Sequence, residues 1–539
     1  MQLAELVAAS QRVGATRSRT AKVAALADVI TAADLELLPT VVAYLSGEPR
    51  QDRLDLGPSA MFGTDVPAAS DGSLSIAEVD AALQRIADTP AGAGSRTARI
   101  SALTDLLGRA TAEEQEWLRR LVVRDLRQGA LAGLLTTAIA RATDVPEPAV
   151  RRAAMLSGDL RITAVAAVTG GERALDAFGL EVGRALEPML ASTSASVTDA
   201  LEASAGADGA TEVVVEAKLD GARVQAHRSG DEVRLFTRNL NVVTHRLPEV
   251  VAVVRSLPVR SVVLDGEVLA LDDHGRPRRF QDTMARVGRG REATADGEDV
   301  PLSVRFFDIL HLDGEDVIDR PLRDRLEVLV RAVPDGSRVD QLVTADPDEA
   351  EAFLQRTLAA GHEGVMVKDL DAPYEAGRRG ATWRKVKPVH TLDLVVLAAE
   401  WGSGRRHGWL SNIHLGALAE PGDPVDVEHG GLGFTMLGKT FKGMTDELLA
   451  WQTEQLLARE VRREGHVASG SGSDHVVHVR PELVVEVALD GFVRSTRYAG
   501  GIAMRFARVR GYRHDKDADA ADTLTAARAI FTGERPPTG

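Results

Sequence analysis

Lysine is rare in this chain, and the few lysines present occur in motifs that could carry chemistry. Of the 64 lysine and arginine residues, eight are lysines, which leaves 56 arginines. A lysine amine can lose its proton and attack an electrophile, whereas an arginine guanidinium stays charged. One lysine stands in Lys218-Leu219-Asp220-Gly221, between two runs of β-forming residues. Lys218 is therefore the first candidate for a nucleophile.

Two carboxylates lie beside short hydrophobic strands. Glu267 closes the motif Leu264-Asp265-Gly266-Glu267, and Glu363 stands directly before the strand-like run 364–368. Side chains alternate between the faces of a strand, which places Lys368 on the face of this run opposite its two valines. Carboxylate oxygens suit Mg²⁺, which binds few of them and completes its shell with phosphate oxygens and water. Glu267 and Glu363 are therefore candidate metal ligands.

Basic side chains accompany these carboxylates. In the run 383–387, Lys385 and Lys387 alternate onto one strand face. Two ammonium groups on one face repel each other unless they meet an anion or solvent. Together with Arg223 and Arg379, these lysines could stabilise charge on a phosphorus centre in a transition state.

These elements together describe one site, at which a lysine could attack a phosphorus centre. At its ordinary pKa of ~10.4, a lysine is a poor nucleophile at neutral pH. Nearby cations lower that pKa, and a divalent metal lowers it more strongly. A lysine that attacks the α-phosphate of a nucleotide forms a phosphoramidate. No Gly-x4-Gly-Lys-Ser/Thr loop is present, which argues against ordinary P-loop ATPase chemistry.

Each motif also has a plain structural interpretation. Asp-Gly between two β runs is a strong hairpin signal. Leu-Asp-Gly occurs four times, at 219–221, 264–266, 312–314 and 489–491. The run 364–368 could be an ordinary strand with charged ends, and 383–387 could be a solvated edge strand. A single motif does not decide between these interpretations.

The first 190 residues must form helices, because their apolar residues recur at three- and four-residue spacing. The predicted helices cover 3–13, 23–45, 76–87, 113–134 and 136–142, and another begins at Pro146–Pro148 and ends near Gly158. Proline and glycine break the stretch 47–71 into a loop. Small polar residues at 191–209 predict a flexible linker.

Beyond residue 210 short β-rich runs predominate, which predicts an α+β unit. The predicted strands are 213–219, 224–228, 233–238, 261–271, 304–312, 364–368 and 383–386, with helices near 247–256, 322–333 and 347–360. From Asp393 to Arg513 strands prevail again, and a small β-barrel of ~100–150 residues fits this segment.

Bulk composition excludes several classes of protein. At 539 residues the chain is too long for one core, and about three domains are expected. The absence of cysteine excludes disulfides, thiolate zinc sites and cysteine nucleophiles. We find no signal peptide and no apolar run near the ~20 residues of a membrane span, so we expect a cytoplasmic protein. The net charge of −15 argues weakly against nucleic acid, but basic clusters at 378–409 and 494–516 could neutralise phosphates.

The order and spacing of the motifs resemble those of covalent nucleotidyltransferases, and specifically of ATP-dependent DNA ligases of the bacterial and archaeal-eukaryotic three-domain type. Lys218–Gly221 matches the Lys-x-Asp-Gly motif of that family. The six motifs that follow in order are Thr237–Asn239, Leu264–Glu267, Phe306–Leu310, Glu363–Lys368, Trp383–Lys387 and the segment from Arg505 to Lys516. One motif would be weak, but seven in order are highly specific.

The resemblance implies a multidomain fold with three parts. We expect an all-α DNA-binding domain at 1–205, an α+β nucleotidyltransferase domain (an ATP-grasp-like adenylation domain) at 206–389, and a C-terminal OB-fold β-barrel at 390–539. It also implies a monomer that acts on nicked double-stranded DNA, with ATP as substrate and Mg²⁺ or Mn²⁺ as metal. We expect no association with a membrane. The expected location is the bacterial cytoplasm, where the protein would act on the DNA of the nucleoid.

The resemblance further implies roles for individual residues. Lys218 would carry the AMP, and Glu267 and Glu363 would hold the metal. The other residues expected to contact ATP are Glu216 at the adenine amino group, Arg223 and Arg238 at ribose and phosphate, Phe307 stacked on adenine, Glu267 near the ribose, and Arg379, Lys385 and Lys387 at the α-phosphate. Arg513, Asp515 and Lys516 would act on the pyrophosphate. The last motif departs from the family pattern, since Ala507 stands where the family often has proline.

The sequence therefore predicts an ATP-dependent DNA ligase that seals nicks through a lysine–AMP intermediate. An NAD-dependent ligase fits less well, because those enzymes resemble chains with a cysteine zinc module. An RNA capping guanylyltransferase or an RNA ligase shares Lys-x-Asp-Gly, but the helical first 190 residues argue against both. A catalytically dead DNA-binding relative is the alternative from a different class.

Overall fold

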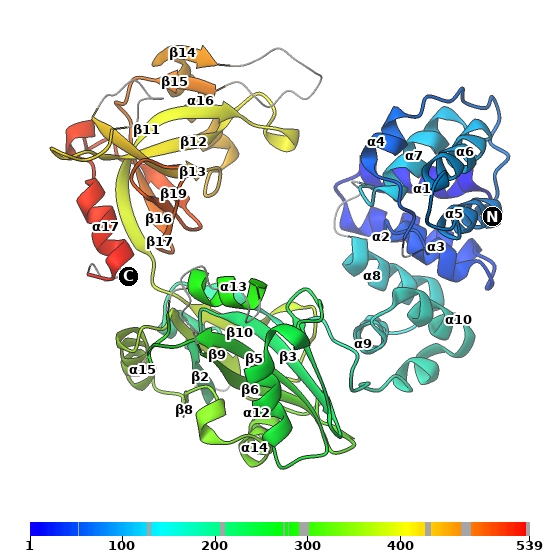
Figure 1. Ribbon diagram of the computed structural model, residues 1–539, viewed down its shortest axis with the longest axis horizontal. Helices are drawn as coiled ribbons and strands as arrows, with labels where there is room; N and C mark the ends of the chain where they lie inside the picture. The colour runs from blue at the N-terminus through cyan, green and yellow to red at the C-terminus, as the bar shows by residue number, and fades with distance from the viewer. Residues whose placement is uncertain are drawn as a thin grey trace.

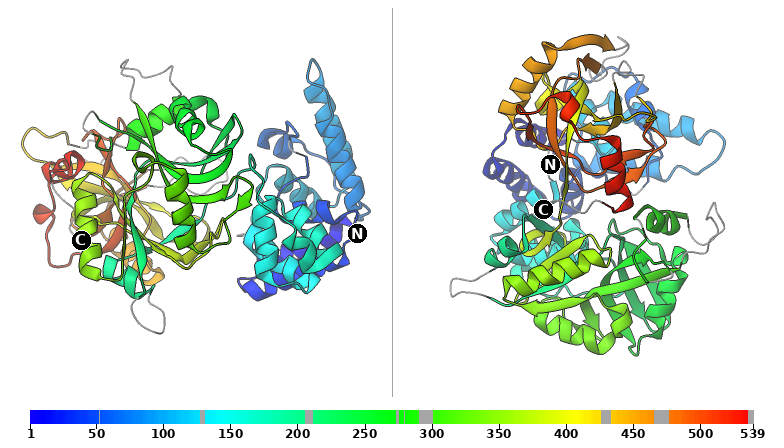
Figure 2. Two further views of the ribbon diagram at one scale, coloured as in Figure 1. Left: turned by 90° about the horizontal axis from the view of Figure 1, so that it is seen from below. Right: turned by 90° about the vertical axis from the view of Figure 1, so that its left-hand side faces the viewer.

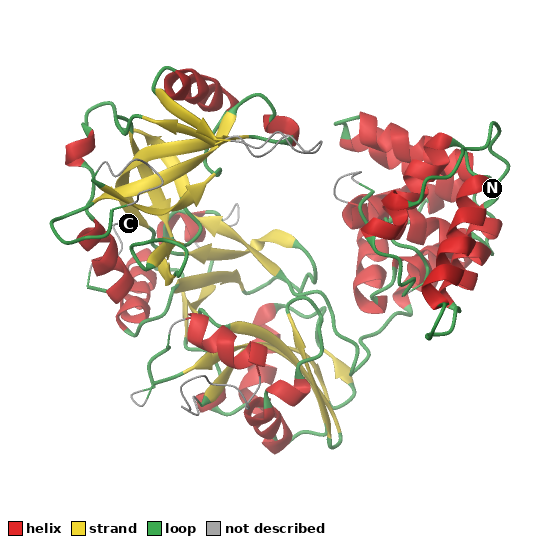
Figure 3. Cartoon of the chain, turned by 45° about the horizontal axis from the view of Figure 1, so that its top comes forward, coloured by secondary structure: helices red, strands yellow, loops and turns green. Residues whose placement is uncertain are grey.

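The computed structural model describes residues 1–51, 53–126, 131–204, 211–272, 275–278, 280–289, 301–425, 433–464 and 476–534. It contains a helical body, a central α+β body and a C-terminal body built on a β-sheet (Figure 1). The three form an arc that is open between the helical and the C-terminal body (Figure 3). Seen from below, the helical body lies beside the central one (Figure 2). Within the described part of the chain, no helix is long and apolar enough to cross a membrane.

The N-terminal body is all-α, as predicted. Its helices are α1 (Leu3–Ala15), α2 (Arg19–Ala32), α3 (Leu38–Leu45), α4 (Pro58–Gly63), α5 (Ile76–Ala87), α6 (Ser95–Gly108), α7 (Ala112–Val122), α8 (Leu131–Thr143), α9 (Glu147–Ser157) and α10 (Leu160–Asp176). Capping residues explain where two of these helices begin or end. Ser75 starts α5 in a capping box with Glu78, and Gly158, in the left-handed backbone region, ends α9. The apolar helix faces pack into a core of their own.

The structure corrects several predictions for this region. The apolar run 23–45 forms two helices, since α2 ends at Ala32 and Pro39 lies in the first turn of α3, where its missing N–H costs nothing. The run 113–134 likewise divides between α7 and α8. The expected loop 47–71 contains the short helix α4.

The stretch expected to be a flexible linker, 191–209, is ordered over most of its length. It contains most of β1 (Leu190–Ser194), which pairs in parallel with β10 (Arg379–Val386), and helix α11 (Val197–Glu202). Residues 205–209 lie outside the described residues. The predicted boundary at residue 205 stays a prediction, but β1 and α11 before it pack on the central body.

The central body consists of two five-stranded sheets, in the orders β1-β10-β9-β2-β8 and β4-β3-β5-β6-β7. Besides β1 and β10, the strands are β2 (Val213–Lys218), β3 (Ala222–Ser229), β4 (Glu232–Thr237), β5 (Ser261–Ala270), β6 (Leu302–Leu312), β7 (Glu315–Asp316), β8 (Gln341–Thr344) and β9 (Gly364–Asp369). The helices are α12 (Pro248–Ser256), α13 (Phe280–Arg289), α14 (Leu322–Ala332) and α15 (Pro347–Ala359). Strand β10 lies between β1 and β9, so the edge-strand interpretation of 383–387 is wrong.

The chain passes from one sheet to the other directly after Lys218. Strand β2 pairs with β8 and β9, whereas β3 pairs with β4 and β5, so Asp220-Gly221 does not close a hairpin. A Cβ at Gly221 would lie 2.2 Å from the carbonyl oxygen of Val268. Only glycine fits where the backbone crosses β5 this closely.

The other Leu-Asp-Gly motifs differ from one another. The motif 264–266 lies in the middle of β5, where a Cβ at Gly266 would approach the Phe306 ring to 2.7 Å. The motif 312–314 does form the turn between β6 and β7, and both Asp313 and Gly314 have positive φ there. The turn interpretation is therefore right for 312–314 and wrong for 264–266, where close packing requires the glycine.

The C-terminal body is rich in strands, as predicted. Its elements are β11 (His390–Trp401), β12 (Leu410–Leu418), β13 (Phe434–Thr440), α16 (Asp446–Leu457), β14 (Glu460–Glu464), β15 (Val476–Val479), β16 (Val484–Leu489), β17 (Phe492–Arg494), β18 (Ile502–Met504), β19 (Arg508–Tyr512) and α17 (Leu524–Thr532). The long strand β11 pairs with β16 along its first half and with β15 near its end. This seven-stranded sheet encloses an apolar core, while its assignment as an OB-fold stays a prediction.

Candidate active site

A cavity of about 660 Å³ lies where the chain crosses between the two sheets. Helix α13 contributes Phe280, Met284 and Val287 to its wall, and the C-terminal body contributes Arg505 and Phe506. Many of the residues singled out from the sequence line it together: Glu216, Lys218, Arg223, Arg238, Glu267, Phe307, Arg379 and Lys385. The fold therefore gathers motifs that lie as far apart in the sequence as Lys218 and Arg505.

Lys218 ends strand β2, and its amine forms an ion pair with Glu363. Glu363 also pairs with Lys387, whose ammonium group donates a 2.7 Å hydrogen bond to Asp490 of the C-terminal body. Burial alone would raise the pKa of Glu363, but Lys218 and Lys387 together lower it below its ordinary value. The candidate nucleophile is thus held at the cavity wall by an ionised carboxylate.

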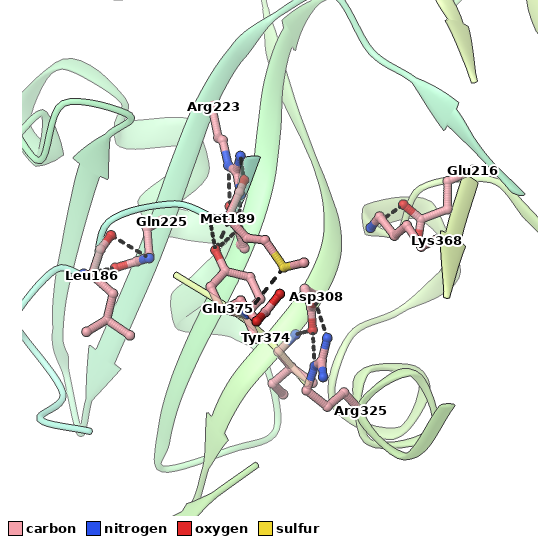
Figure 4. A network of polar contacts seen from close by, with 12 residues as sticks. Leu186, Met189, Glu216, Arg223, Gln225, Asp308, Arg325, Lys368, Tyr374 and Glu375 are labelled. Carbon is pink, nitrogen blue, oxygen red and sulfur yellow. Dashed lines mark hydrogen bonds and ion pairs between the residues drawn. The ribbon is translucent and has the colours of Figure 1, made fainter. Parts of the chain in front are cut away.

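Glu216 forms a buried ion pair with Lys368 at 2.5 Å, and the two side chains are 2% and 1% exposed (Figure 4). The Lys368 ammonium group lies 4.6 Å from the ring centroid of Phe307 and 4.2 Å from that of Trp383. The second carboxylate oxygen of Glu216 is buried and has no hydrogen-bond partner among the described residues. It is therefore free to accept a hydrogen bond from a ligand in the cavity.

The guanidinium group of Arg223 is held mainly by protein groups. It donates to both oxygens of Asp265, at 3.0 and 2.6 Å, and to the carbonyl oxygen of Met189 at 2.7 Å. The ring of Phe307 lies 5.5 Å from this guanidinium carbon. Arg223 lines the cavity, but only a small part of its donor capacity remains for a nucleotide, and its contact with ribose and phosphate stays a prediction.

Three cations at the cavity wall are less constrained. Arg238 and Arg379 are exposed, and within the described ranges neither has a hydrogen-bonded or ion-pair partner. Lys385 is half-buried on β10, and burial lowers its pKa, which Lys218 and Arg379 lower further. These side chains offer positive charge to an anion such as a phosphate.

Glu267 lines the cavity and has no side-chain partner among the residues that the structure describes. Burial raises its pKa to about 8, although Arg223 and Lys218 act in the opposite direction. A bound cation would favour the ionised form and remove this penalty. The donor set therefore fits a hard divalent metal held by Glu267 with few protein ligands. Glu363 is not part of the cavity lining, but it pairs with Lys218, which is.

We expect the metal requirement of the site to depend on pH through Glu267. At pH 7 its carboxyl group is mostly protonated in the absence of a cation, so binding of Mg²⁺ must release a proton. The Mg²⁺ concentration that gives half-maximal activity should fall by about tenfold per pH unit up to pH ~8 and then level off. Titrations of protein–AMP adduct formation at several pH values test this, and Glu267→Gln should remove the pH dependence. A metal requirement that is the same at pH 6 and 8 would contradict the assignment.

The three residues expected at the pyrophosphate do not line the cavity in this structure. Arg513 pairs with Asp393 at 2.9 Å and with Asp515 at 2.7 Å, and Lys516 pairs with the same Asp393 at 2.6 Å. From the same motif, Arg505 and Phe506 reach the cavity instead. Arg505 forms hydrogen bonds of 2.7 and 3.0 Å with Asp220.

Several cavity residues received no role from the sequence. Lys368 and Trp383 stood in recognised motifs, and strand alternation did place Lys368 on the face opposite the buried valines. Asp265 and Arg505 also stood in recognised motifs but received no role of their own, and Tyr374 gave no signal in the sequence; of these three, only Arg505 lines the cavity. Their importance depends on contacts between residues more than 40 positions apart.

Comparisons with known proteins bear on this geometry. Three family models match in order: DNA ligase N terminus at 59–140, ATP dependent DNA ligase domain at 188–387 and ATP dependent DNA ligase C terminal region at 406–516. A probable DNA ligase from a Nocardioides strain is 55% identical over 535 residues, which cover 98% of this chain and 99% of that protein. The chain belongs to the ATP-dependent DNA ligase family. The resemblance inferred from the motifs is therefore confirmed.

Other members of the family are similar over the same length. A probable DNA ligase from Mycolicibacterium gilvum is 52% identical over 533 residues, with 98% of this chain and 99% of that protein covered. Among solved structures, Pmar-Lig_PreS3 covers 94% of this chain and 99% of its own, with a TM-score of 0.55 and 18% identity. This last likeness concerns the fold alone.

Proposed function

We propose that the protein seals nicks in duplex DNA in an ATP-dependent reaction with a covalent lysine–AMP intermediate. The observation that carries the proposal is the position of Lys218, whose amine lies at the wall of a cavity lined by cationic and carboxylate side chains. Membership of the ATP-dependent DNA ligase family supports ATP as the substrate. Incubation of the protein with labelled ATP and a nicked duplex tests both parts of the proposal.

The reaction consists of three in-line displacements at phosphorus. First, the deprotonated Lys218 amine attacks the α-phosphorus of ATP, a P–N bond forms, and pyrophosphate leaves. Second, an oxygen of the 5′-phosphate at the nick attacks the same phosphorus and the P–N bond breaks. Third, the 3′-hydroxyl attacks the activated 5′-phosphate, a phosphodiester forms, and AMP leaves.

The residues around the cavity have distinct roles in the first displacement. The free oxygen of Glu216 accepts a hydrogen bond from the adenine amino group, and Phe307 stacks against the base. Arg379 and Lys385 neutralise the α-phosphate, and Arg238 contacts ribose or phosphate at the exposed side. Lys387 forms an ion pair with Glu363, which in turn pairs with Lys218.

We propose Mg²⁺, or Mn²⁺ in its place, as the metal held by Glu267 and Glu363. When bound there, such a cation supplies positive charge to the phosphate oxygens of the nucleotide. The raised pKa of Glu267 and its lack of a protein partner among the described residues support this position. Before metal is bound, the ion pairs of Glu363 with Lys218 and Lys387 keep that carboxylate in its ionised form.

We further propose that the protein is a monomer whose three bodies surround the duplex. The open arc of Figure 3 leaves a space between the helical and C-terminal bodies, and we assign the C-terminal one to the OB-fold class. Contacts would be chiefly to phosphates and therefore without sequence preference. Affinity for DNA should fall steeply with salt.

The C-terminal body must also move during the reaction. Arg513, Asp515 and Lys516 would approach the pyrophosphate after this movement, which requires that Arg513 and Lys516 release their ion pairs with Asp393.

One parallel assay separates the alternatives. The protein is incubated with a nicked duplex and with ATP, GTP or NAD as the only nucleotide. Sealing and adduct formation with ATP alone agree with the proposal. An adduct formed with GTP would favour a capping enzyme, and DNA binding without any adduct would favour a catalytically dead relative.

Replacement of Glu363 by alanine should weaken catalysis through loss of the metal. The Mg²⁺ concentration for half-maximal adduct formation should rise by at least about tenfold, since even outer-shell partners of metal ligands are worth 10–100-fold in affinity. Asp490→Asn is the matched control, because it removes the other carboxylate on Lys387 and should leave the metal requirement unchanged. Equal Mg²⁺ titration curves for Glu363→Ala and the unmodified protein would exclude this role.

A further inference from the structure

The segment 179–191, here called the strap, connects the helical body to the first sheet and is held by one face of strand β3. Alternate side chains of β3 bind its backbone at intervals of three residues. The three pairs are His227 with the Gly183 amide at 3.0 Å, Gln225 with the Leu186 amide at 2.8 Å, and Arg223 with the Met189 carbonyl oxygen at 2.7 Å. Burial lowers the pKa of His227 to about 3, so its ring is neutral and can accept the Gly183 hydrogen bond.

Tyr374 closes a ring of hydrogen bonds at the last of these pairs (Figure 4). Its hydroxyl group donates to Asp265 at 2.6 Å and accepts from the amide of Met189 at 3.1 Å. Arg223 donates to the same Asp265 and to the carbonyl oxygen of Met189, and its Nη2 lies 3.3 Å from the tyrosine oxygen. Tyr374 is 2% exposed, so water cannot easily replace it in this ring.

The end of the strap is also a wall of the nucleotide cavity. Met189, Leu190 and Ala191 line the cavity together with Arg223. The amide of Leu190 donates to the carbonyl oxygen of Arg378 at 2.9 Å, so the strap also fixes the backbone directly before the cavity residue Arg379. Tyr374 itself lines no part of the cavity, and its ring meets Trp383 edge to face at 5.9 Å.

Apolar contacts continue this arrangement into the helical body. One buried cluster joins Leu156 of α9 to Leu186 and Met189 of the strap and to Tyr374 and Trp383 of the central body. Arg152 of α9 pairs with Asp319 at 2.7 Å and donates to the carbonyl oxygen of Phe178. The strap therefore packs against both the helical body and the central body.

We propose that Tyr374 is a positioning residue for the nucleotide site, whose hydroxyl group fixes the Arg223 guanidinium and the Met189–Ala191 wall before ATP binds. Without this hydroxyl, Asp265 loses one donor and the Met189 amide loses its acceptor, so Arg223 and the strap can adopt other arrangements. ATP would then have to order both groups on binding. The proposal rests on the proposed function, since it assumes that ATP enters this cavity.

The test uses the full chain with Tyr374→Phe, which keeps the ring and removes only the hydroxyl group. Rates of protein–AMP adduct formation are measured across ATP concentrations at saturating Mg²⁺. The ATP concentration for half-maximal rate should rise by about tenfold, the equivalent of one charge-assisted hydrogen bond, while the maximal rate changes by less than about twofold. Tyr44→Phe is the matched control, because it removes a buried hydroxyl group from the core of the helical body and should change neither value.

Two results would overturn the proposal. One is an unchanged ATP concentration for half-maximal rate in Tyr374→Phe. The other is a fall in the maximal rate alone, because such a fall would mean that the hydroxyl group affects the chemical step and not the binding of the nucleotide. Should Tyr374→Phe fail to fold, Gln225→Leu decides in its place. It releases the same strap at Leu186 without touching the cavity lining, and an unchanged ATP requirement there would likewise overturn the proposal.

A second measurement separates this proposal from the proposed function. Hydrogen–deuterium exchange at the Met189 amide needs no nucleotide, and it should become at least about tenfold faster in Tyr374→Phe, because the hydroxyl is its acceptor. If the unmodified protein never forms an adduct with ATP, the proposed function fails while this exchange result still stands. Unchanged exchange at Met189 would show that Tyr374 does not hold the strap.

Discussion

Replacing Lys218 with arginine is expected to abolish the covalent adduct between the protein and AMP. The guanidinium group keeps a positive charge at this position but cannot lose its proton to attack phosphorus. The rate of adduct formation should fall by about 10⁴-fold or more, as expected when the nucleophile itself is removed. Mass spectrometry of protein treated with ATP and Mg²⁺ measures the adduct directly.

The same variant should still bind nicked DNA, because arginine keeps the positive charge of Lys218 and the other basic groups of the protein are unchanged. Its partner Glu363 keeps a second cation, Lys387, so the ion pair network is not left with an uncompensated carboxylate. Lys442→Arg is a suitable control, since that lysine belongs to the C-terminal body and does not line the cavity. Persistence of the AMP adduct in Lys218→Arg, on any residue, would refute the assignment of the nucleophile.

Strand periodicity allowed much of the fold around Lys218 to be predicted from the sequence. The runs 213–219, 261–271 and 304–312 agree with β2, β5 and β6 to within two residues at each end. The relation between the sheets could not be predicted in this way. Asp220-Gly221 carries the signal of a hairpin, yet the close approach of β5 makes it a crossing between sheets.

The cavity residues on strands were predictable because alternation fixes which side chains share a face. Lys385 and Trp383 line the cavity together, and Lys368 reaches it while Val365 and Val367 enter the core. The ion pairs that hold these groups were not predictable, since each joins distant segments. Asp393 is an example, because nothing in its local sequence indicates that it binds Arg513 and Lys516, more than 100 residues later.

A second large effect is expected at the buried ion pair between Asp308 and Arg325, although neither residue lines the cavity. Both side chains are fully buried, and Arg325 donates to the two oxygens of Asp308 at 2.8 and 3.0 Å (Figure 4). Asp308→Asn leaves the guanidinium charge buried without its counter-ion. The free energy of unfolding should fall by about 3–5 kcal/mol, because breaking a buried pair costs far more than the pair itself contributes.

The matched control for this effect lies two residues away in the same helix. Arg323 pairs with Asp371 at 2.7 Å, but these side chains are 46% and 61% exposed, so Asp371→Asn should cost less than about 1 kcal/mol. Replacing both buried partners together, as Asp308→Leu with Arg325→Met, should give a more stable protein than Asp308→Asn, since no unpaired charge remains. Denaturant unfolding of the three variants measures these differences. Equal losses for Asp308→Asn and Asp371→Asn would show that burial does not decide the cost of breaking an ion pair in this body.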